Sequence, residues 1–142
     1  MREIKFRGML RNGEWAYGGY VKIKDGANCI LSGECDHCES DGGTKNVLKF
    51  NAVKYKTVGQ YTGLKDKNGV EIYEGDIVKF GKGEWYDSCG HSGAEPTNET
   101  IEWNDYGWSP FTLEGYDGEI MWSPSNCEVI GNIYENPELV KK

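Results

Sequence analysis

The chain has 142 residues, of which 37% are hydrophobic and 27% charged, and it contains 20 glycines. This composition suits one globular domain or two small subdomains, and it excludes collagen, a coiled coil and a disordered chain. No apolar run approaches the ~20 residues that cross a bilayer. The first residues also lack the apolar stretch of a signal peptide, so we expect neither a membrane-spanning segment nor a leader.

Charge is unevenly distributed along the chain. Residues 1–63 contain 10 Lys and Arg against 7 Asp and Glu, whereas residues 64–142 contain 6 against 16. Because duplex phosphates attract Lys and Arg clusters, the acidic second half argues against nonspecific binding of nucleic acid. The basic residues that could still contact phosphate are Lys5, Arg7, Arg11 and Lys22. The alternatives are an ordinary solvated face, or a meeting of the opposite charges within one chain or between chains.

Short runs that alternate apolar and polar residues predict strands along most of the chain. In chain order they cover residues 4–6, 15–17, 20–23, 29–31, 47–50, 53–56, 77–80, 101–103, 108–113, 120–122 and 129–133. Asn12-Gly13 predicts a two-residue turn after the first strand. Two polar stretches, 32–46 and 81–99, are expected to be surface loops. The one helical signal is at residues 136–139, where Asn136 can cap and Pro137 suits the first turn.

This pattern predicts a mainly β protein. We expect a small N-terminal β subdomain over residues 1–63 and a C-terminal SH3-like β-barrel over residues 64–142, together forming one compact unit.

Three blocks of the sequence resemble the YopX family of phage and prophage proteins. Residues 58–78 read VGQYTGLKDKNGVEIYEGDIV, residues 2–7 read REIKFR, and residues 129–139 read VIGNIYENPEL. The blocks occur in the family's order and span nearly the whole chain. The resemblance implies a mainly β fold with an SH3-like C-terminal part, in a protein encoded by a bacteriophage or integrated element and working in the host cytoplasm. It implies no activity.

The long block has two interpretations. Gly63, Gly69 and Gly75 suit tight reversals of the chain, and Asp76 suits a turn, which favours a structural role. The functional interpretation makes residues 65–68 a recognition loop.

The sequence contains no phosphate-binding loop, no dinucleotide-binding glycine motif and no nucleophile elbow. His37 and His91 are the only histidines that could serve a nucleophile as a base. We therefore predict no enzymatic activity and no required cofactor.

Zinc is the one cofactor for which the sequence offers ligands. Cys35 and Cys38 have the C-x-x-C spacing in which two thiolates chelate one zinc ion, and Cys89 and His91 could complete a tetrahedral set. Four protein ligands leave no open position, so such a site would be structural. The alternative is two exposed loops with reduced thiols. The odd count of five cysteines favours a reducing cytoplasm over a disulfide framework.

The tryptophans of the second half are candidates for a binding surface. Trp103 alternates in phase with Ile101 and is expected in the core. Trp103, Trp108 and Trp122 could form a stacking platform or a peptide groove, and of the tryptophans Trp108 and Trp85 are expected to be the more exposed.

Two functions compete. The leading interpretation is a non-enzymatic phage accessory protein, a β module that binds a host or phage protein and also associates with itself, most simply as a dimer. The alternative is a nucleic-acid-associated or zinc-dependent protein that uses the basic N-terminal half or the Cys/His loops. An acidic DNA mimic fits less well, because a net charge of −7 on 142 residues is modest for that role.

Overall fold

The fold comes from a computed structural model. The structure describes residues 2–38, 43–80, 96–111 and 123–140, and of residues 34–38 and 43–47 it describes the backbone. The chain divides into two compact units, residues 1–60 (unit 1) and residues 61–142 (unit 2).

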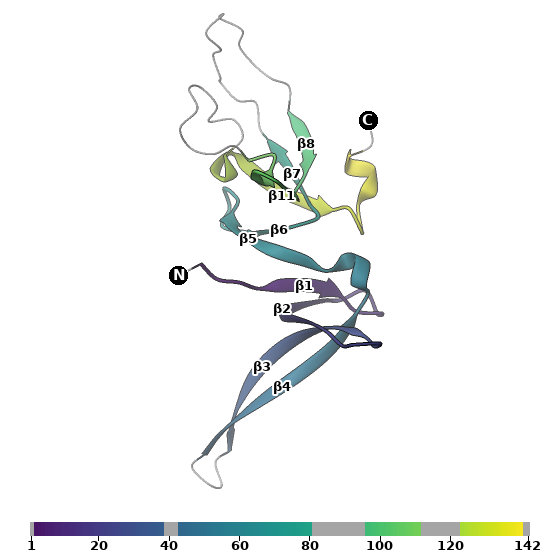
Figure 1. Cartoon of the computed structure of the whole chain (residues 1–142). Coiled ribbons are helices and arrows are strands. Elements are labelled where there is room, and N and C mark those ends of the chain that lie inside the picture. Colours follow the sequence, from purple (N-terminus) through teal and green to yellow (C-terminus); the bar gives the residue numbers. More distant parts are fainter. Residues whose placement is uncertain (1, 39–42, 81–95, 112–122, 141–142) are drawn as a thin grey trace, which may run out of the picture. The chain divides into compact units, whose positions relative to one another are not determined.

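Unit 1 is an antiparallel sheet of strands that follow one another in sequence (Figure 1). Its strands are β1 (Phe6–Met9), β2 (Trp15–Lys22), β3 (Asn28–Cys38) and β4 (Gly43–Val53), in the order β4-β3-β2-β1. A 3-10 turn, η1 (Tyr55–Thr57), leads to β5 (Gly59–Lys65), whose first two residues pair with β1. The core of the unit includes the buried side chains of Met9, Ala16, Cys29 and Ile30.

The polar stretch 32–46, expected to be a loop, is largely a β-hairpin. β3 continues to Cys38 and β4 begins at Gly43, with every residue from 28 to 38 paired across the ladder. Ladder hydrogen bonds join backbone groups, so a strand does not need apolar side chains to pair. A polar strand shows no alternation, and the sequence pattern therefore missed it.

The turn predicted at Asn12-Gly13 is present, but its loop has three residues instead of the predicted two. The N–H of Leu10 bonds the carbonyl of Glu14 at 2.8 Å, which closes a three-residue loop. Only Gly13 of this loop has a positive φ, +88°, which is typical of a hairpin loop ending in a left-handed residue.

Unit 2 contains short strands arranged in several pairings. They are the end of β5, β6 (Glu71–Tyr73), β7 (Asp76–Phe80), β8 (Thr97–Thr100), β9 (Glu102–Asn104), β10 (Gly107–Ser109) and β11 (Cys127–Asn132), with 3-10 turns η3 (Pro124–Asn126) and η4 (Pro137–Val140). β7 is the central strand of an antiparallel sheet in the order β11-β7-β8, and β9 and β10 form a hairpin. The helical turn predicted near residue 137 corresponds to η4.

The core of unit 2 is a cluster of fully buried side chains from four segments. It comprises Ile72, Val78, Phe80, Ile101 and Cys127. Leu64, Trp108, Phe111 and Val129 pack against it from the side. The period-two prediction for residues 77–80 is thus confirmed in part, since Lys79 alone of β7 is exposed.

The prediction of a mainly β protein is confirmed, because the described helical segments are 3-10 turns of three or four residues. The described strands form open sheets, with none closed on itself. The SH3-like barrel therefore stays a prediction, and the strand expected at residues 120–122 lies outside the described residues. No helix in the described part of the chain is long and apolar enough to span a membrane.

One glycine of unit 1 permits a close approach between strands. Gly18 has a φ of +153°, and a Cβ built on it would lie 1.8 Å from the carbonyl oxygen of Leu31 in β3. Gly33 lies in the same sheet, yet a Cβ there meets no atom of the described side chains or backbone within 4 Å.

We expect Gly18→Ala to lower the free energy of unfolding by more than ~2 kcal/mol, because backbone must move to admit the methyl group. Gly33→Ala is the matched control and should change stability by less than ~0.5 kcal/mol. Urea unfolding followed by circular dichroism measures both. Equal stabilities of the two variants would contradict the close approach of β2 and β3.

Candidate functional site

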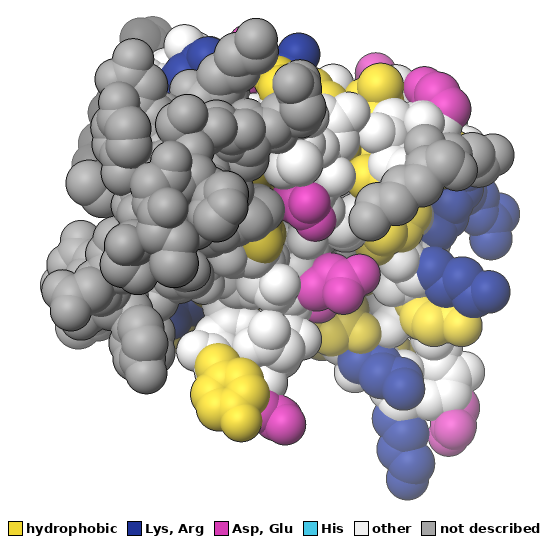
Figure 2. All heavy atoms as spheres, turned by 90° about the horizontal axis from the view of Figure 1, so that it is seen from above, with side chains coloured by type: hydrophobic (Ala, Val, Ile, Leu, Met, Phe, Trp, Pro, Cys, Tyr) yellow, Lys and Arg dark blue, Asp and Glu magenta, His cyan; other side chains and the backbone are white. Residues whose placement is uncertain are grey.

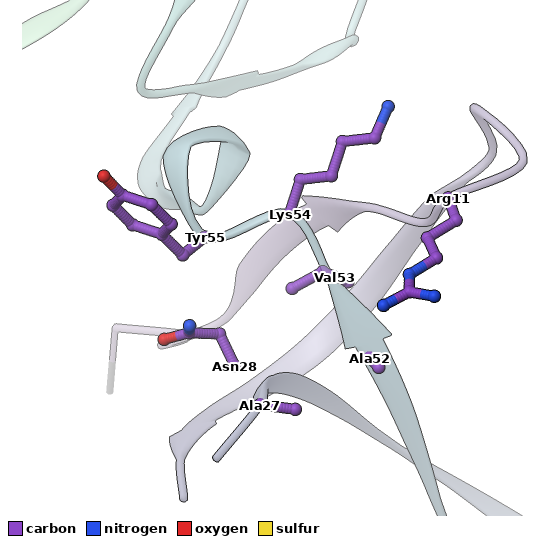
Figure 3. Close-up of a pocket in the computed structure, with 7 residues that line it drawn as sticks. All are labelled: Arg11, Ala27, Asn28, Ala52, Val53, Lys54 and Tyr55. Atoms are coloured by element: carbon purple, nitrogen blue, oxygen red, sulfur yellow. The ribbon is translucent and has the colours of Figure 1, made fainter. Parts of the chain in front are cut away.

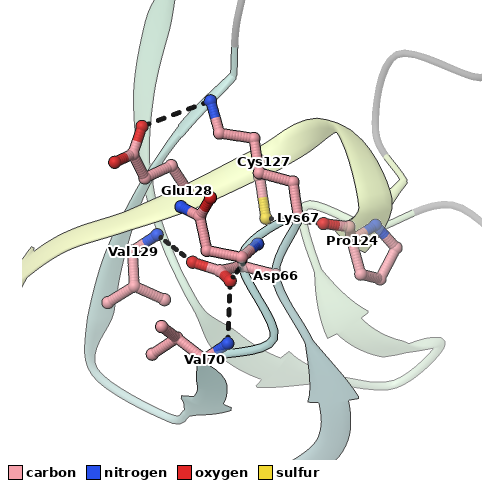
Figure 4. A network of polar contacts seen from close by, with 8 residues as sticks. Asp66, Lys67, Val70, Pro124, Cys127, Glu128 and Val129 are labelled. Carbon is pink, nitrogen blue, oxygen red and sulfur yellow. Dashed lines mark hydrogen bonds and ion pairs between the residues drawn. The ribbon is translucent and has the colours of Figure 1, made fainter.

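The long family-like block contains a buried carboxylate, Asp66, whose side chain is 6% exposed. Its Oδ1 accepts hydrogen bonds from the backbone N–H groups of Asn68 (2.8 Å) and Val70 (2.9 Å). Its Oδ2 accepts one from Val129 of β11, at 3.0 Å (Figure 4). The carboxylate therefore organises its own turn and joins that turn to a strand 63 residues away.

The same contacts set the protonation of Asp66. Burial acts to raise the pKa of its carboxyl, but the N–H groups of Val129, Val70 and Asn68 and the Lys67 ammonium act in the opposite direction. The net result is a pKa below the ordinary value of 3.8. Asp66 is therefore an ionised structural group at neutral pH rather than a proton donor.

Cys127, beside this network, carries a neutral thiol. Its Sγ donates a hydrogen bond to the carbonyl of Pro124 at 3.2 Å. Burial, together with the negative charge of Asp66, raises the pKa of the thiol to about 12, although Lys67 acts against this. A thiol of that pKa is a poor nucleophile and a poor metal ligand at neutral pH.

Two of the four residues that were candidates for a recognition loop, residues 65–68, make contacts within unit 2. Asp66 is directed into the protein, and the Lys67 ammonium lies 3.3 Å from Oε2 of Glu128 on β11. The backbone N–H of Lys67 also bonds the carbonyl of Cys127 at 3.0 Å. These contacts favour the structural role for the block.

A second set of contacts joins the block to the C-terminal one. The N–H of Gly75 bonds the carbonyl of Ile101 (2.9 Å), and the carbonyl of Gly75 accepts from Ile133 (3.0 Å). Gly75 has a φ of +85°, and a Cβ on it would lie 3.0 Å from the ring of Tyr134. The buried Asp76 carboxylate accepts the N–H of Tyr73 at 2.8 Å, as a turn-forming side chain should.

The aromatic residues of β9 and β10 form the clearest exposed feature of unit 2. We call residues 102–109 the aromatic hairpin. Trp103 and Trp108 are cross-strand partners, with ring centroids 4.9 Å apart and an edge-to-face arrangement. Trp103 is 59% exposed and Tyr106, in the turn, is 86% exposed.

The predictions for Trp103 and Trp108 are reversed by the structure. Trp108 packs on the core, whereas Trp103 is exposed. The reason lies at Ile101, which falls between β8 and β9 and bonds the carbonyl of Asp76 through its N–H. The chain leaves the β7 sheet there, so the alternation through Ile101 does not continue into β9. Trp85 lies outside the described residues.

Unit 1 has an exposed apolar strip that the sequence pattern did not reveal. Leu48 and Phe50, on β4, are 66% and 60% exposed. They are two residues apart on one strand and so lie on the same face. The pattern of residues 47–50 predicts a strand, but it does not say which strand lies at the outside of the sheet.

A cavity of about 310 Å³ also lies in unit 1 (Figure 3). It is lined by Arg11, Ala27, Asn28, Ala52, Val53, Lys54 and Tyr55. The ammonium of Lys54 and the hydroxyl of Tyr55 point away from the Arg11 guanidinium. Its polar groups thus do not converge on one point, as groups that orient a substrate do.

Two of the basic candidates for phosphate contact are engaged within the chain. Arg7 is buried, and its guanidinium lies 4.6 Å from the ring centre of Trp15. Lys5 lies 3.2 Å from the carboxylate of Glu3. On the face shown in Figure 2, the Lys and Arg side chains share the surface with Asp, Glu and apolar side chains.

The four predicted zinc ligands fall into two groups. Cys35 and Cys38 lie in β3, in register with Asn46 and Gly43 of β4. Cys89 and His91 lie outside the described residues. Within the described ranges, no three His, Cys, Asp or Glu side chains are grouped so that they could hold a metal ion.

Comparison with known proteins identifies the family. The YopX protein family matches residues 5–141, so the chain belongs to that family. Among solved structures, the chain resembles the crystal structure of protein EF1440 from Enterococcus faecalis at 26% identity and a TM-score of 0.56. The match covers 99% of this chain and 100% of that one. Comparison with curated proteins gives no match.

We expect Asp66→Asn to lower the free energy of unfolding by about 2 kcal/mol, the size of a hydrogen bond to a charged group. The amide keeps one acceptor oxygen, but its NH₂ group faces a backbone N–H. Asp105→Asn, at an exposed position of the aromatic hairpin, is the control and should change stability by less than ~0.5 kcal/mol. Urea unfolding at neutral pH measures both, and similar losses for the two variants would contradict the role of Asp66.

The difference in stability between the unaltered chain and the Asp66→Asn variant should also depend on pH. Because the pKa of Asp66 is lower in the folded state than the ordinary 3.8, the unfolded state binds the proton more readily. The stabilisation is therefore fully present above about pH 5 and is lost as the pH falls through 3.8 toward the folded-state pKa. Unfolding of both proteins from neutral to acidic pH measures the difference. A difference that stays constant over this range would show that the charge of Asp66 is not involved.

Cys127 should resist alkylation in the folded chain. With its pKa at about 12 instead of the ordinary 9.0, its thiolate fraction at a given mildly alkaline pH is about a thousandth of that of a free thiol. Mass spectrometry after a short treatment with iodoacetamide should find Cys127 unmodified in the native protein and modified in urea. Rapid labelling of the native protein would contradict a buried, neutral thiol.

Proposed function

We propose that the chain is a non-enzymatic protein-binding β module that binds a host or phage protein. We propose further that it is encoded by a phage or prophage and works in the cytoplasm of the host bacterium, as its membership of the YopX family suggests. Unit 2, in this proposal, is an SH3-like barrel to which the aromatic hairpin belongs.

The observation that carries the proposal is the exposed aromatic pair on the hairpin. Trp103 and Tyr106 are 59% and 86% exposed, while Trp108 packs on the core and contacts Trp103 edge-on. The exposed rings thus stand on a hairpin attached to the core. Trp and Tyr on such supports are the residues that most often dominate the energy of protein–protein contacts.

The hairpin also has a defined shape at its turn. Asn104 Oδ1 accepts the N–H of Tyr106 at 2.9 Å, which fixes the turn that presents the tyrosine. A preorganised aromatic surface loses little conformational entropy when it binds. This supports recognition of a protein rather than chemistry on a small substrate.

Replacement of Trp103 tests the proposal. The chain, immobilised and exposed to lysate of phage-infected host cells, should retain a specific protein, and Trp103→Ser should weaken that binding at least ~10-fold. Ile4→Ser removes an apolar side chain that is 70% exposed elsewhere, and it should bind as the unaltered chain does. A captured protein that binds both variants equally would place the binding surface outside the hairpin.

A DNA mobility shift at two salt concentrations tests the alternative. The proposal expects no shift at low salt. A shift that weakens as salt rises would favour binding of nucleic acid through the basic first half of the chain.

A further inference from the structure

We infer that Cys35 and His37 of β3 form a chelating pair for one zinc ion, on one face of the ribbon that β3 and β4 make together. This pair differs from Cys35 and Cys38, which the C-x-x-C spacing predicts. The inference is independent of the proposed function, because it uses neither the aromatic hairpin nor a protein partner.

The ladder between β3 and β4 fixes which residues share a face. Its pairs run from Asn28 with Val53 to Cys38 with Gly43, and each step along β3 is matched by one step along β4. In such an uninterrupted ladder, successive residues of a strand lie on opposite faces and directly paired residues lie on the same face. The odd-numbered residues of β3 therefore share one face with their even-numbered partners on β4.

This register separates the two cysteines. Cys35 and Cys38 lie on opposite faces, and three residues span about 10 Å along a strand. A zinc ion requires both sulfurs at about 2.3 Å. The two thiolates can therefore bind one ion only if residues 35–38 leave the ladder.

Cys35 and His37 can chelate without any change in the ladder. They are neighbours on one face, separated by about 7 Å along the strand. A thiolate and an imidazole at neighbouring positions can reach one ion between them, because the metal bonds add about 2.3 and 2.0 Å to the two side chains. Zinc accepts both types of ligand.

The residues paired with these two positions carry no charge. On β4, Asn46 is paired with Cys35 and Thr44 with His37. The lysine between them, Lys45, lies on the other face. A cationic residue paired with either ligand would repel a metal ion, and the register places none there.

The exposed strip of β4 lies on the same face as the pair. Phe50 is paired with Leu31 and Leu48 with Gly33, and both partners are odd-numbered residues that precede Cys35. Apolar side chains near a metal limit the access of water to it. The attraction between the ion and a thiolate is stronger in such surroundings.

The outer half of the ribbon gains stability from a bound ion. β2 pairs with β3 only as far as Leu31, so beyond that residue the described strands form a two-stranded ribbon (Figure 1). Two strands alone are marginally stable in water. Cys35 and His37 keep their spacing only while β3 is extended, and zinc therefore favours the paired form of the ribbon.

Two protein ligands leave open positions on the ion. Zinc is usually four-coordinate, so water or a group of another molecule completes the set. The site thus differs from a structural site with four protein ligands, and we expect reversible binding.

Zinc titration of the reduced chain, followed by calorimetry, tests the inference. The chain should bind about one ion. Cys35→Ser and His37→Ala should each weaken binding at least ~10-fold, since even the loss of an outer-shell partner has an effect of that size. Cys38→Ser is the matched control and should bind as the unaltered chain does. Circular dichroism checks that each variant is folded.

Moving the histidine by one residue tests the face directly. The double variant Asp36→His, His37→Ala keeps a histidine next to Cys35 in sequence but places it on the other face. It should bind zinc as weakly as His37→Ala. Cys35→His, which keeps two ligands on one face, should still bind zinc. Full binding by the double variant would overturn the inference.

Cobalt distinguishes one thiolate from two. Co²⁺ bound by thiolates has a charge-transfer absorption whose intensity rises with the number of thiolates. The absorption should correspond to one thiolate per ion, and Cys38→Ser should leave it unchanged. Loss of zinc or cobalt binding in Cys38→Ser would overturn the inference in favour of Cys35 and Cys38, and a reduced chain that binds no zinc would overturn it outright. Neither result bears on the aromatic hairpin.

Discussion

The buried carboxylate of Asp66 is the interaction on which unit 2 depends. It accepts three backbone N–H groups, two from its own turn and one from Val129 of β11. Burial of a charge is costly unless hydrogen bonds compensate it, and here three backbone N–H groups supply them. Turn and strand are thereby joined by one side chain, with the fully buried Cys127 beside it.

Backbone and side-chain contacts account for several residues of the family-like blocks. The long block and the C-terminal block meet at Asp66 with Val129, and again where the carbonyl of Gly75 accepts the N–H of Ile133. Gly75 is left-handed and lies against the ring of Tyr134. Asn132 Oδ1 in turn accepts the N–H groups of Tyr134 and Glu135, which shapes the end of the C-terminal block. The long block and the C-terminal block are therefore held together by packing and backbone hydrogen bonds.

The sequence pattern was sufficient to predict β7, which is buried except at Lys79, and most of β11. The pattern did not predict the polar half of β3 and β4, because the two strands pair there through backbone hydrogen bonds and the side chains do not alternate. The prediction that Trp103 is buried was also wrong. Ile101 lies between β8 and β9, and the alternation of buried residues does not continue from Ile101 to Trp103. The exposed pair Leu48 and Phe50 was not predictable either, since exposure depends on which strand is outermost. The zinc ligands stay a prediction, with Cys89 and His91 outside the described residues.

The buried polar residues of the family-like blocks and the exposed aromatic side chains occupy different parts of the chain. Within the blocks 58–78 and 129–139, Asp66, Asp76 and Asn132 are buried, and their side chains accept backbone N–H groups. The aromatic hairpin and the strip on β4 both lie outside these blocks. Replacing an exposed residue such as Trp103 or Phe50 removes little packing, so these positions can change without loss of the fold. The binding surface proposed for the aromatic hairpin therefore lies between the blocks, where a substitution leaves the buried contacts of the turns intact.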